Sequence, residues 1–259
     1  MYTVQDFTTG TGGGAMLPEI PQDELSTALD ACVAQMLDEA DLQSPPVDAL
    51  AVASRLGFVV ARDERMQSRA RFVRLAVHAQ RGRPGMILLG SEPRRERQQW
   101  AVAHELAEAT AHRVFDALGI QPQEAPAAAR EQVANWMAGR LLLPCGWFAE
   151  DARRCDWDLA GLKDRYSTAS HELIARRMLD FSPPVIITVF DQGRMIWRRS
   201  NLTGGVPLLS SIERELWHDV RDTCCHRQRS DGPFRVQCWP VHEPDWKREI
   251  LRTEIAEVA

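Results

Sequence analysis

The chain has 259 residues, of which 26% are charged and 44% belong to the hydrophobic set, so it can bury a sizeable core. Its formal net charge of −5 gives no basic footprint for nucleic acid, and no apolar run approaches the roughly 18 residues of a membrane span. The N-terminus lacks the basic start and apolar core of a secretory signal. Six cysteines without such a signal predict reduced thiols and a cytoplasmic protein.

The first segments predict a flexible leader followed by two helices and a strand. Residues 1–19 contain a glycine cluster but lack the Lys-Ser/Thr pair of a phosphate loop. Apolar residues recur at helical spacing from Pro21 to Ala40. A second helix is expected from Ala49 to Leu56, and the apolar strand Phe58–Ala61 follows it.

Residues 62 to 97 alternate between polar and apolar side chains, as strands do. A strand is expected at Arg71–Ala79, a turn at Arg81–Gly85 and a short apolar strand at Met86–Gly90. Ser91 is expected to cap the next helix, with Pro93 among its first residues.

The next helix, Gln98–Phe115, carries His and Glu at a spacing typical of metal chemistry. His104 and Glu108 are four residues apart and therefore share one helix face, with Glu105 about 100° round the axis. An imidazole and a carboxylate can bind a divalent metal, and a neighbouring carboxylate can take a proton from water on that metal. This is the His-Glu-x-x-His metallopeptidase layout with Glu108 in place of the second His. The alternative is an ordinary amphipathic helix.

A second helix is predicted from Ala127 to Leu143, and it places Glu131, Asn135 and Ala138 on one face. Pro144 ends it. Beyond it lies a segment rich in Trp and Asp, from residue 147 to residue 159.

The last third of the chain predicts helices, a hairpin and a charged end. A helix is expected at Ser167–Asp180, where Ser170 can serve as the cap. Two apolar runs flank the turn signal Asp191–Gly193 and predict a β-hairpin. A further helix at Ser211–Cys224 and a strand at Phe234–Val241 precede the charged end.

Three further interpretations of the polar residues stay open. His112 lies about 12 Å from His104 along a straight helix, so one metal cannot bind both. His112 could pair with Glu108 only if His104 were left out, which favours a position next to a ligand or an ordinary position near a helix end. Five cysteines and histidines near the C-terminus could bind a second metal, but they lack the spacing of a standard zinc finger. These residues are Cys224, Cys225, His226, Cys238 and His242. The alternative is that the cysteines are ordinary buried thiols. The segment Ser167–Leu179 could be half of a DNA-binding helix pair or a structural helix.

Several segments, in order, resemble the ImmA/IrrE-type metallopeptidases, zinc-dependent enzymes that cleave helix-turn-helix repressors in mobile elements and radiation-response circuits. AVAHELAEATAH (residues 101–112) is similar to the Ala-His-Glu-Leu-Gly-His helix of that family. EQVANWMAGRLLLP (residues 131–144) is similar to its Glu-x-x-Ala-Asn-x-Phe-Ala-x-x-Leu-Leu-x-Pro helix. Segments 44–60, 86–90 and 166–179 also resemble family segments. The resemblance spans about residues 20 to 200.

This resemblance implies a role for four residues of the chain. His104 would be the first metal ligand, Glu105 the general base and Glu131 the third ligand. Glu108 occupies the position of the second ligand, which is His in the family. The implied cofactor is a divalent metal, zinc by family. A set of one His and two Glu is more anionic than the family set and shifts the preference toward harder ions such as manganese.

The resemblance also implies an α+β fold with a zincin-like metallopeptidase core, a small sheet plus two packed helices, over residues 20–145. Residues 146–205 would add a helical segment with a β-hairpin, and residues 206–259 a C-terminal extension. The expected function is a cytoplasmic metal-dependent endopeptidase acting on a DNA-binding repressor, in transcription regulation and the stress response. The alternative is a catalytically degenerate pseudo-peptidase that binds a partner or senses a signal. Neither membrane association nor direct nucleic-acid binding is expected.

Overall fold

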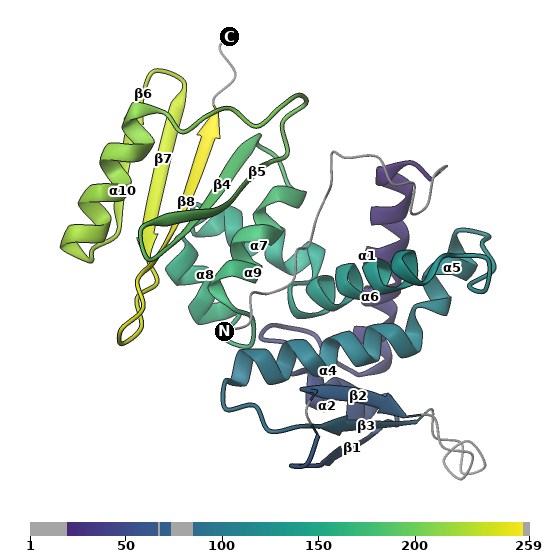
Figure 1. Ribbon diagram of the computed structural model, residues 1–259. Helices are drawn as coiled ribbons and strands as arrows, with labels where there is room; N and C mark the ends of the chain where they lie inside the picture. The colour runs from purple at the N-terminus through teal and green to yellow at the C-terminus, as the bar shows by residue number, and fades with distance from the viewer. Residues whose placement is uncertain (1–19, 67, 74–84, 256–259) are drawn as a thin grey trace.

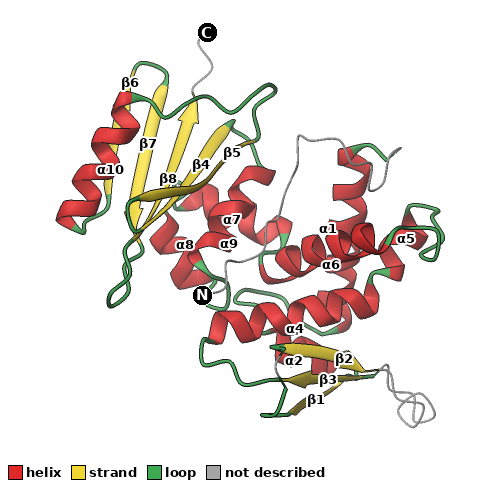
Figure 2. Cartoon of the chain, viewed as in Figure 1, coloured by secondary structure: helices red, strands yellow, loops and turns green. Residues whose placement is uncertain are grey.

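The computed structural model describes residues 20–66, 68–73 and 85–255. Within these ranges the chain forms a mixed α+β fold with one three-stranded sheet and one five-stranded sheet (Figures 1 and 2). The expected α+β class is therefore confirmed. The leader expected at residues 1–19 and the turn at 81–84 lie outside the described residues, as does the second half of the strand expected at Arg71–Ala79.

Two helices open the described chain, as the sequence predicts. Helix α1 is Gln22–Glu39 and helix α2 is Ala49–Arg55. Asp48 caps α2, because its carboxylate accepts from the backbone N–H groups of Leu50 at 3.0 Å and Ala51 at 3.3 Å. Buried apolar residues of both helices belong to the main hydrophobic core.

The small sheet consists of β1 Val59–Arg62, β2 Ala70–Val73 and β3 Met86–Leu89. Its order is β1-β3-β2, with β3 parallel to β1 and antiparallel to β2. Because β2 pairs with a strand on one side only, it forms an edge of this sheet.

The central helix differs from the prediction at both ends. Helix α4 is Arg95–Thr110, with Arg94 as the N-cap residue, so Ser91 is not the cap and Pro93 precedes the helix. Buried Glu92 accepts from the N–H of Arg94 at 3.1 Å, and no side chain of a described residue caps the first turn of α4.

The single helix expected from Gln98 to Phe115 is two helices. Helix α5, His112–Ala117, leaves the axis of α4 (Figure 1). Thr110 Oγ1 donates to the backbone oxygen of Leu106 at 2.7 Å. Ala111 separates the two helices, and His112 begins α5.

Helix α6, Ala127–Leu142, packs along α4 and closely matches its predicted bounds. α4 lies between the small sheet and α6 (Figure 1), so both of its long sides are covered. The chain continues with four short helical elements: α7 Cys145–Arg154, α8 Leu159–Arg165, α9 His171–Arg177 and the 3-10 turn η1 Met178–Asp180. Ser170 caps α9 as predicted, whereas α7 occupies most of the Trp- and Asp-rich segment and was not predicted as a helix.

The second sheet is antiparallel throughout and has the order β5-β4-β8-β7-β6. Its strands are β4 Val185–Asp191, β5 Arg194–Ser200, β6 Arg227–Asp231, β7 Phe234–Pro240 and β8 Arg248–Ile255. β4 and β5 form the predicted hairpin. Helix α10, Ser211–Thr223, packs against β6, β7 and β8.

The last described residues form a strand, where the sequence analysis predicts only a charged end. Residues 248–255 form β8, which pairs with both β4 and β7 at the middle of the sheet. The boundary expected between residues 205 and 206 thus falls inside one sheet, because β4 and β5 precede it and β8 follows it.

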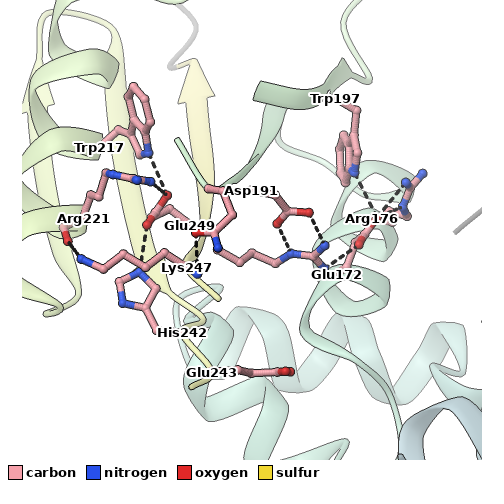
Figure 3. Close-up of polar contacts among 12 residues, drawn as sticks. Glu172, Arg176, Asp191, Trp197, Trp217, Arg221, His242, Glu243, Lys247 and Glu249 are labelled. Atoms are coloured by element: carbon pink, nitrogen blue, oxygen red, sulfur yellow. Dashed lines mark hydrogen bonds and ion pairs between the residues drawn. The ribbon is translucent and has the colours of Figure 1, made fainter. Parts of the chain in front are cut away.

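Buried charged residues of β8 are held by side chains from several elements (Figure 3). Glu249 is fully buried and accepts from Trp217 Nε1 at 3.0 Å, while His242 Nε2 lies 2.8 Å from its other oxygen. Arg248 forms ion pairs with Asp191 of β4 and Glu172 of α9. These contacts tie α9 and α10 to the sheet and explain how a charged segment forms a central strand.

The six cysteines are all free in the structure, in agreement with the expectation of thiols. Among the described helices, none combines the length and the apolar character that a membrane crossing requires.

Candidate metal centre

Three side chains from α4 and α6 converge at one place. His104 Nε2 lies 3.8 Å from Glu108 Oε1 and 3.6 Å from Glu131 Oε1. One ligand atom from each of the three residues lies within 4.8 Å of the other two. The structure thus brings together the three residues that the sequence analysis singled out as candidate ligands.

The convergence depends on how closely α4 and α6 pack. Both helices bury small side chains, which let two helix axes approach each other. Their fully or almost fully buried alanines include Ala103 and Ala107 on α4 and Ala134 and Ala138 on α6. Because the helices lie side by side, Glu131 reaches the face of α4 that presents His104 and Glu108.

The donor set fits a small divalent ion. A tetrahedral ion with bonds of about 2.0–2.2 Å holds its ligand atoms about 3.3–3.6 Å apart. The two distances from His104 Nε2 are close to that spacing, so modest rotamer changes of the two carboxylates would complete three of four positions. The exposed side-chain fractions are 18% for His104, 45% for Glu108 and 54% for Glu131, which leaves the carboxylate side open to solvent.

The ring of His104 turns its Nε2 toward the two carboxylates. Its buried Nδ1 has no hydrogen-bond partner among the described residues.

Glu105 is anchored by the edge of the small sheet. Its carboxylate is buried, and Oε2 accepts from the backbone N–H of Phe72 in β2 at 2.5 Å. Phe72 is itself held in place, because its ring packs edge-on against Phe58, with centroids 5.9 Å apart, and lies against Gly85. A Cβ at Gly85 would come within 2.3 Å of that ring. The anchor uses Oε2 of Glu105, and Oε1 has no hydrogen bond to another described residue.

The environment of Glu105 favours its protonated form. Burial raises the pKa of the Glu105 carboxyl above its ordinary value, the Phe72 N–H lowers it, and the nearby Glu108 and Glu131 raise it further. His104 also opposes the rise. A carboxyl with a raised pKa beside a group of ligand residues is suited to acid–base chemistry.

The raised pKa predicts that metal affinity depends on pH. Without metal, Glu105 keeps its proton to a higher pH than an ordinary glutamate, and a divalent ion beside it favours the ionised form. Binding then releases this proton, so apparent affinity should rise with pH until Glu105 is ionised. Competition with a chelator across the acid to neutral range would measure this. The Glu105→Gln variant lacks this carboxyl, so its metal affinity should rise less steeply with pH. The same pH dependence of affinity in the natural chain and in the variant would contradict the expectation.

The other candidate ligands lie elsewhere. His112 is exposed at the start of α5 and is not part of the converging group. Cys238 is buried, whereas Cys224 and Cys225 are exposed. His226 stacks on Trp239. Within the described ranges, His104, Glu108 and Glu131 form the one group of His, Cys, Asp and Glu side chains placed to hold a metal ion.

Phe72 is the site residue that the sequence analysis did not single out. It contributes a backbone N–H, and any residue except proline has one, so its identity carries no signal. Its place could be inferred only from the pairing of β2 with β3 and the packing of α4 on that sheet.

Comparisons with known proteins agree with the fold. Residues 53–179 match the family model of the IrrE N-terminal-like domain. The chain is also similar to a solved structure, a Mycobacterium tuberculosis transcriptional regulator, with a TM-score of 0.63 and 16% sequence identity. That similarity covers 90% of this chain and 78% of the other, and at this identity it shows the fold alone. The comparison with curated proteins found no match.

Proposed function

Residues 53–179 belong to the IrrE N-terminal-like peptidase family, and on this basis we propose that the protein is a metal-dependent endopeptidase. In this proposal the small sheet and the α4–α6 pair form a zincin-like core. His104, Glu108 and Glu131 are the metal ligands, and Glu105 is the general base. The observation that supports it most directly is the convergence of the three ligand side chains from two helices.

The chemistry follows from the donor set and from the place of Glu105. When bound, a divalent metal polarises the peptide carbonyl and makes a water more acidic. The Phe72 N–H holds Oε2 of Glu105 in place, and Oε1 would accept a proton from the attacking water as its oxygen bonds to the peptide carbonyl carbon. Glu105 would then pass this proton to the amine nitrogen as the C–N bond breaks. Solvent reaches the side of the site formed by Glu108 and Glu131, whose side chains are 45% and 54% exposed.

The exchange of His for Glu108 changes the expected metal. Two carboxylates donate more negative charge than one, which weakens the metal as a Lewis acid and favours hard ions. Zinc remains the metal that the family implies, and manganese is the alternative that this donor set suggests. The proposed substrate is a DNA-binding repressor, by analogy with the family.

A second function is favoured by one feature of the same site. Glu108 stands where the family has a neutral His ligand, so the donor set is more anionic. Such a donor set weakens the metal as a Lewis acid and so lowers catalysis. The alternative is a pseudo-peptidase that binds a partner or senses a signal without cleaving it.

The substitution Glu108→His separates the two functions. Purified protein would be loaded with zinc or manganese and incubated with helix-turn-helix repressors and an unrelated unfolded protein. If the natural chain is an active enzyme, it should cleave a repressor in the presence of metal, and a chelator should stop the cleavage. His112→Ala serves as the control, because His112 lies outside the converging group. Cleavage by Glu108→His alone would instead identify the natural chain as a pseudo-peptidase.

A further inference from the structure

One side chain beside the candidate metal centre has no role in the proposal above. Asn135 lies one turn beyond Glu131 on the same face of α6, and its Nδ2 donates to Glu131 Oε1 at 3.1 Å. The ionised carboxylate can only accept, so the amide atom that faces it is the nitrogen. The oxygen that accepts this bond is the one that lies 3.6 Å from His104 Nε2.

This bond acts on the orientation of Glu131. The side chain of Glu131 is about half exposed and can rotate freely unless a neighbour holds it. Asn135 is partly buried and shorter, so it has less freedom of its own. With Asn135 bound to Oε1, that oxygen stays directed at His104 before any ion arrives. The ligand set is therefore partly assembled in advance.

The same bond acts on the charge of Glu131. Glu108 brings a second carboxylate to a site that also contains Glu131, and together they make the donor set strongly anionic. An N–H that donates to Oε1 withdraws electron density from the atom that would bind the ion. It thereby offsets part of the charge that Glu108 adds.

We propose that Asn135 is a positioning residue for the Glu131 ligand, which its amide directs toward His104 while it moderates the charge of the binding oxygen. This inference rests on the proposed metal-binding function and goes beyond it, because it assigns a specific residue to the preparation of the site. Asn135 touches neither substrate nor reacting atoms in this role.

The test compares the metal affinity of the full chain with that of Asn135→Ala. Affinity for zinc and for cobalt would be measured by competition with a coloured chelator. Loss of an outer partner of a ligand ordinarily weakens metal binding by about 10- to 100-fold, and we expect a loss in that range. The visible spectrum of the cobalt-loaded variant should also shift, because Glu131 is then free to change its mode of binding. Gln132→Ala is the matched control, since this amide lies on the same helix but off the face shared by Glu131 and Asn135.

A second background separates positioning from a merely structural role. Once Glu131→Ala has removed the ligand, adding Asn135→Ala should cause no further loss of affinity, whereas a structural role would cost affinity in both backgrounds. Asn135→Asp has nearly the same shape but places an acceptor and a negative charge beside Oε1, so it should bind cobalt with a changed spectrum. Unchanged affinity and spectrum in Asn135→Ala, with metal bound normally by the natural chain, would overturn this inference alone. Absence of metal binding by the natural chain would overturn the proposed function as well.

Discussion

Replacing Glu105 with glutamine is expected to abolish peptide-bond cleavage while leaving the bound metal in place. Glutamine has the same shape but cannot take a proton from water, and loss of a general base costs about 100- to 10,000-fold in rate. The amide can keep the contact with the Phe72 N–H through its oxygen, so the packing around residue 105 should survive. Cleavage rate and metal content would be measured on the same preparation.

The control for this substitution is a side-chain change outside the site. His112→Gln alters a titratable side chain near the end of the same helical region but outside the converging group, and its rate should stay close to that of the natural chain. If Glu105→Gln kept the full cleavage rate, Glu105 would not be the base. If it lost its metal together with its activity, Glu105 would act on binding as well as on proton transfer.

The second large effect concerns the stability of the C-terminal sheet. Replacing Glu249 with alanine should lower the free energy of unfolding by about 3–5 kcal/mol, because it removes one partner of a buried polar network. Trp217 Nε1 would lose its acceptor, and the His242 ring, 2.8 Å from the carboxylate, would lose its hydrogen-bond partner (Figure 3). The Arg221 guanidinium, 3.5 Å from the carboxylate, would lose its counter-charge. Unfolding in denaturant would measure the change.

Glu243→Ala provides the matched control for Glu249→Ala. Glu243 forms an ion pair with Arg94 at 2.8 Å, but the side chains of both residues are half exposed. Such a pair contributes only about 0–1 kcal/mol, so this variant should unfold almost as the natural chain does. Equal losses in the two variants would contradict the distinction between buried and exposed carboxylates.

Much of the local structure could be predicted from sequence patterns. Helix α6 and the hairpin β4–β5 were expected near their observed bounds, because periodic apolar residues and clear turn signals mark both. Ser170 was expected as the cap of α9 and is its cap. These features depend on residues close together in the sequence.

The features that were missed depend on contacts between distant segments. The sequence of β8 predicts only a charged end. Side chains that bind Arg248, Glu249 and Arg252 come from α9, α10 and β7, and the sequence does not show that these segments lie close together. The other missed feature is the break at Ala111 between α4 and α5. Apolar periodicity signals neither feature.

The candidate site also combines features that the local sequence predicts with features that depend on contacts between distant segments. The spacing of His104 and Glu108 places them on one helix face, whereas the role of Glu131 came from a resemblance and its proximity from the packing of two helices. Asn135 and Glu131 were expected on one face of α6, and the structure adds the hydrogen bond between them. The Phe72 N–H could not be predicted, because it reaches Glu105 across 33 positions of the chain.

The metal content of freshly purified protein, determined by elemental mass spectrometry, tests the central claim most directly. The natural chain is expected to carry close to one equivalent of a divalent metal. His104→Ala should carry almost none, because His104 is the one ligand of the group that belongs to the buried side of the site. His112→Ala should retain the metal. Equal metal content in the natural chain and in His104→Ala would contradict a metal centre at His104, Glu108 and Glu131.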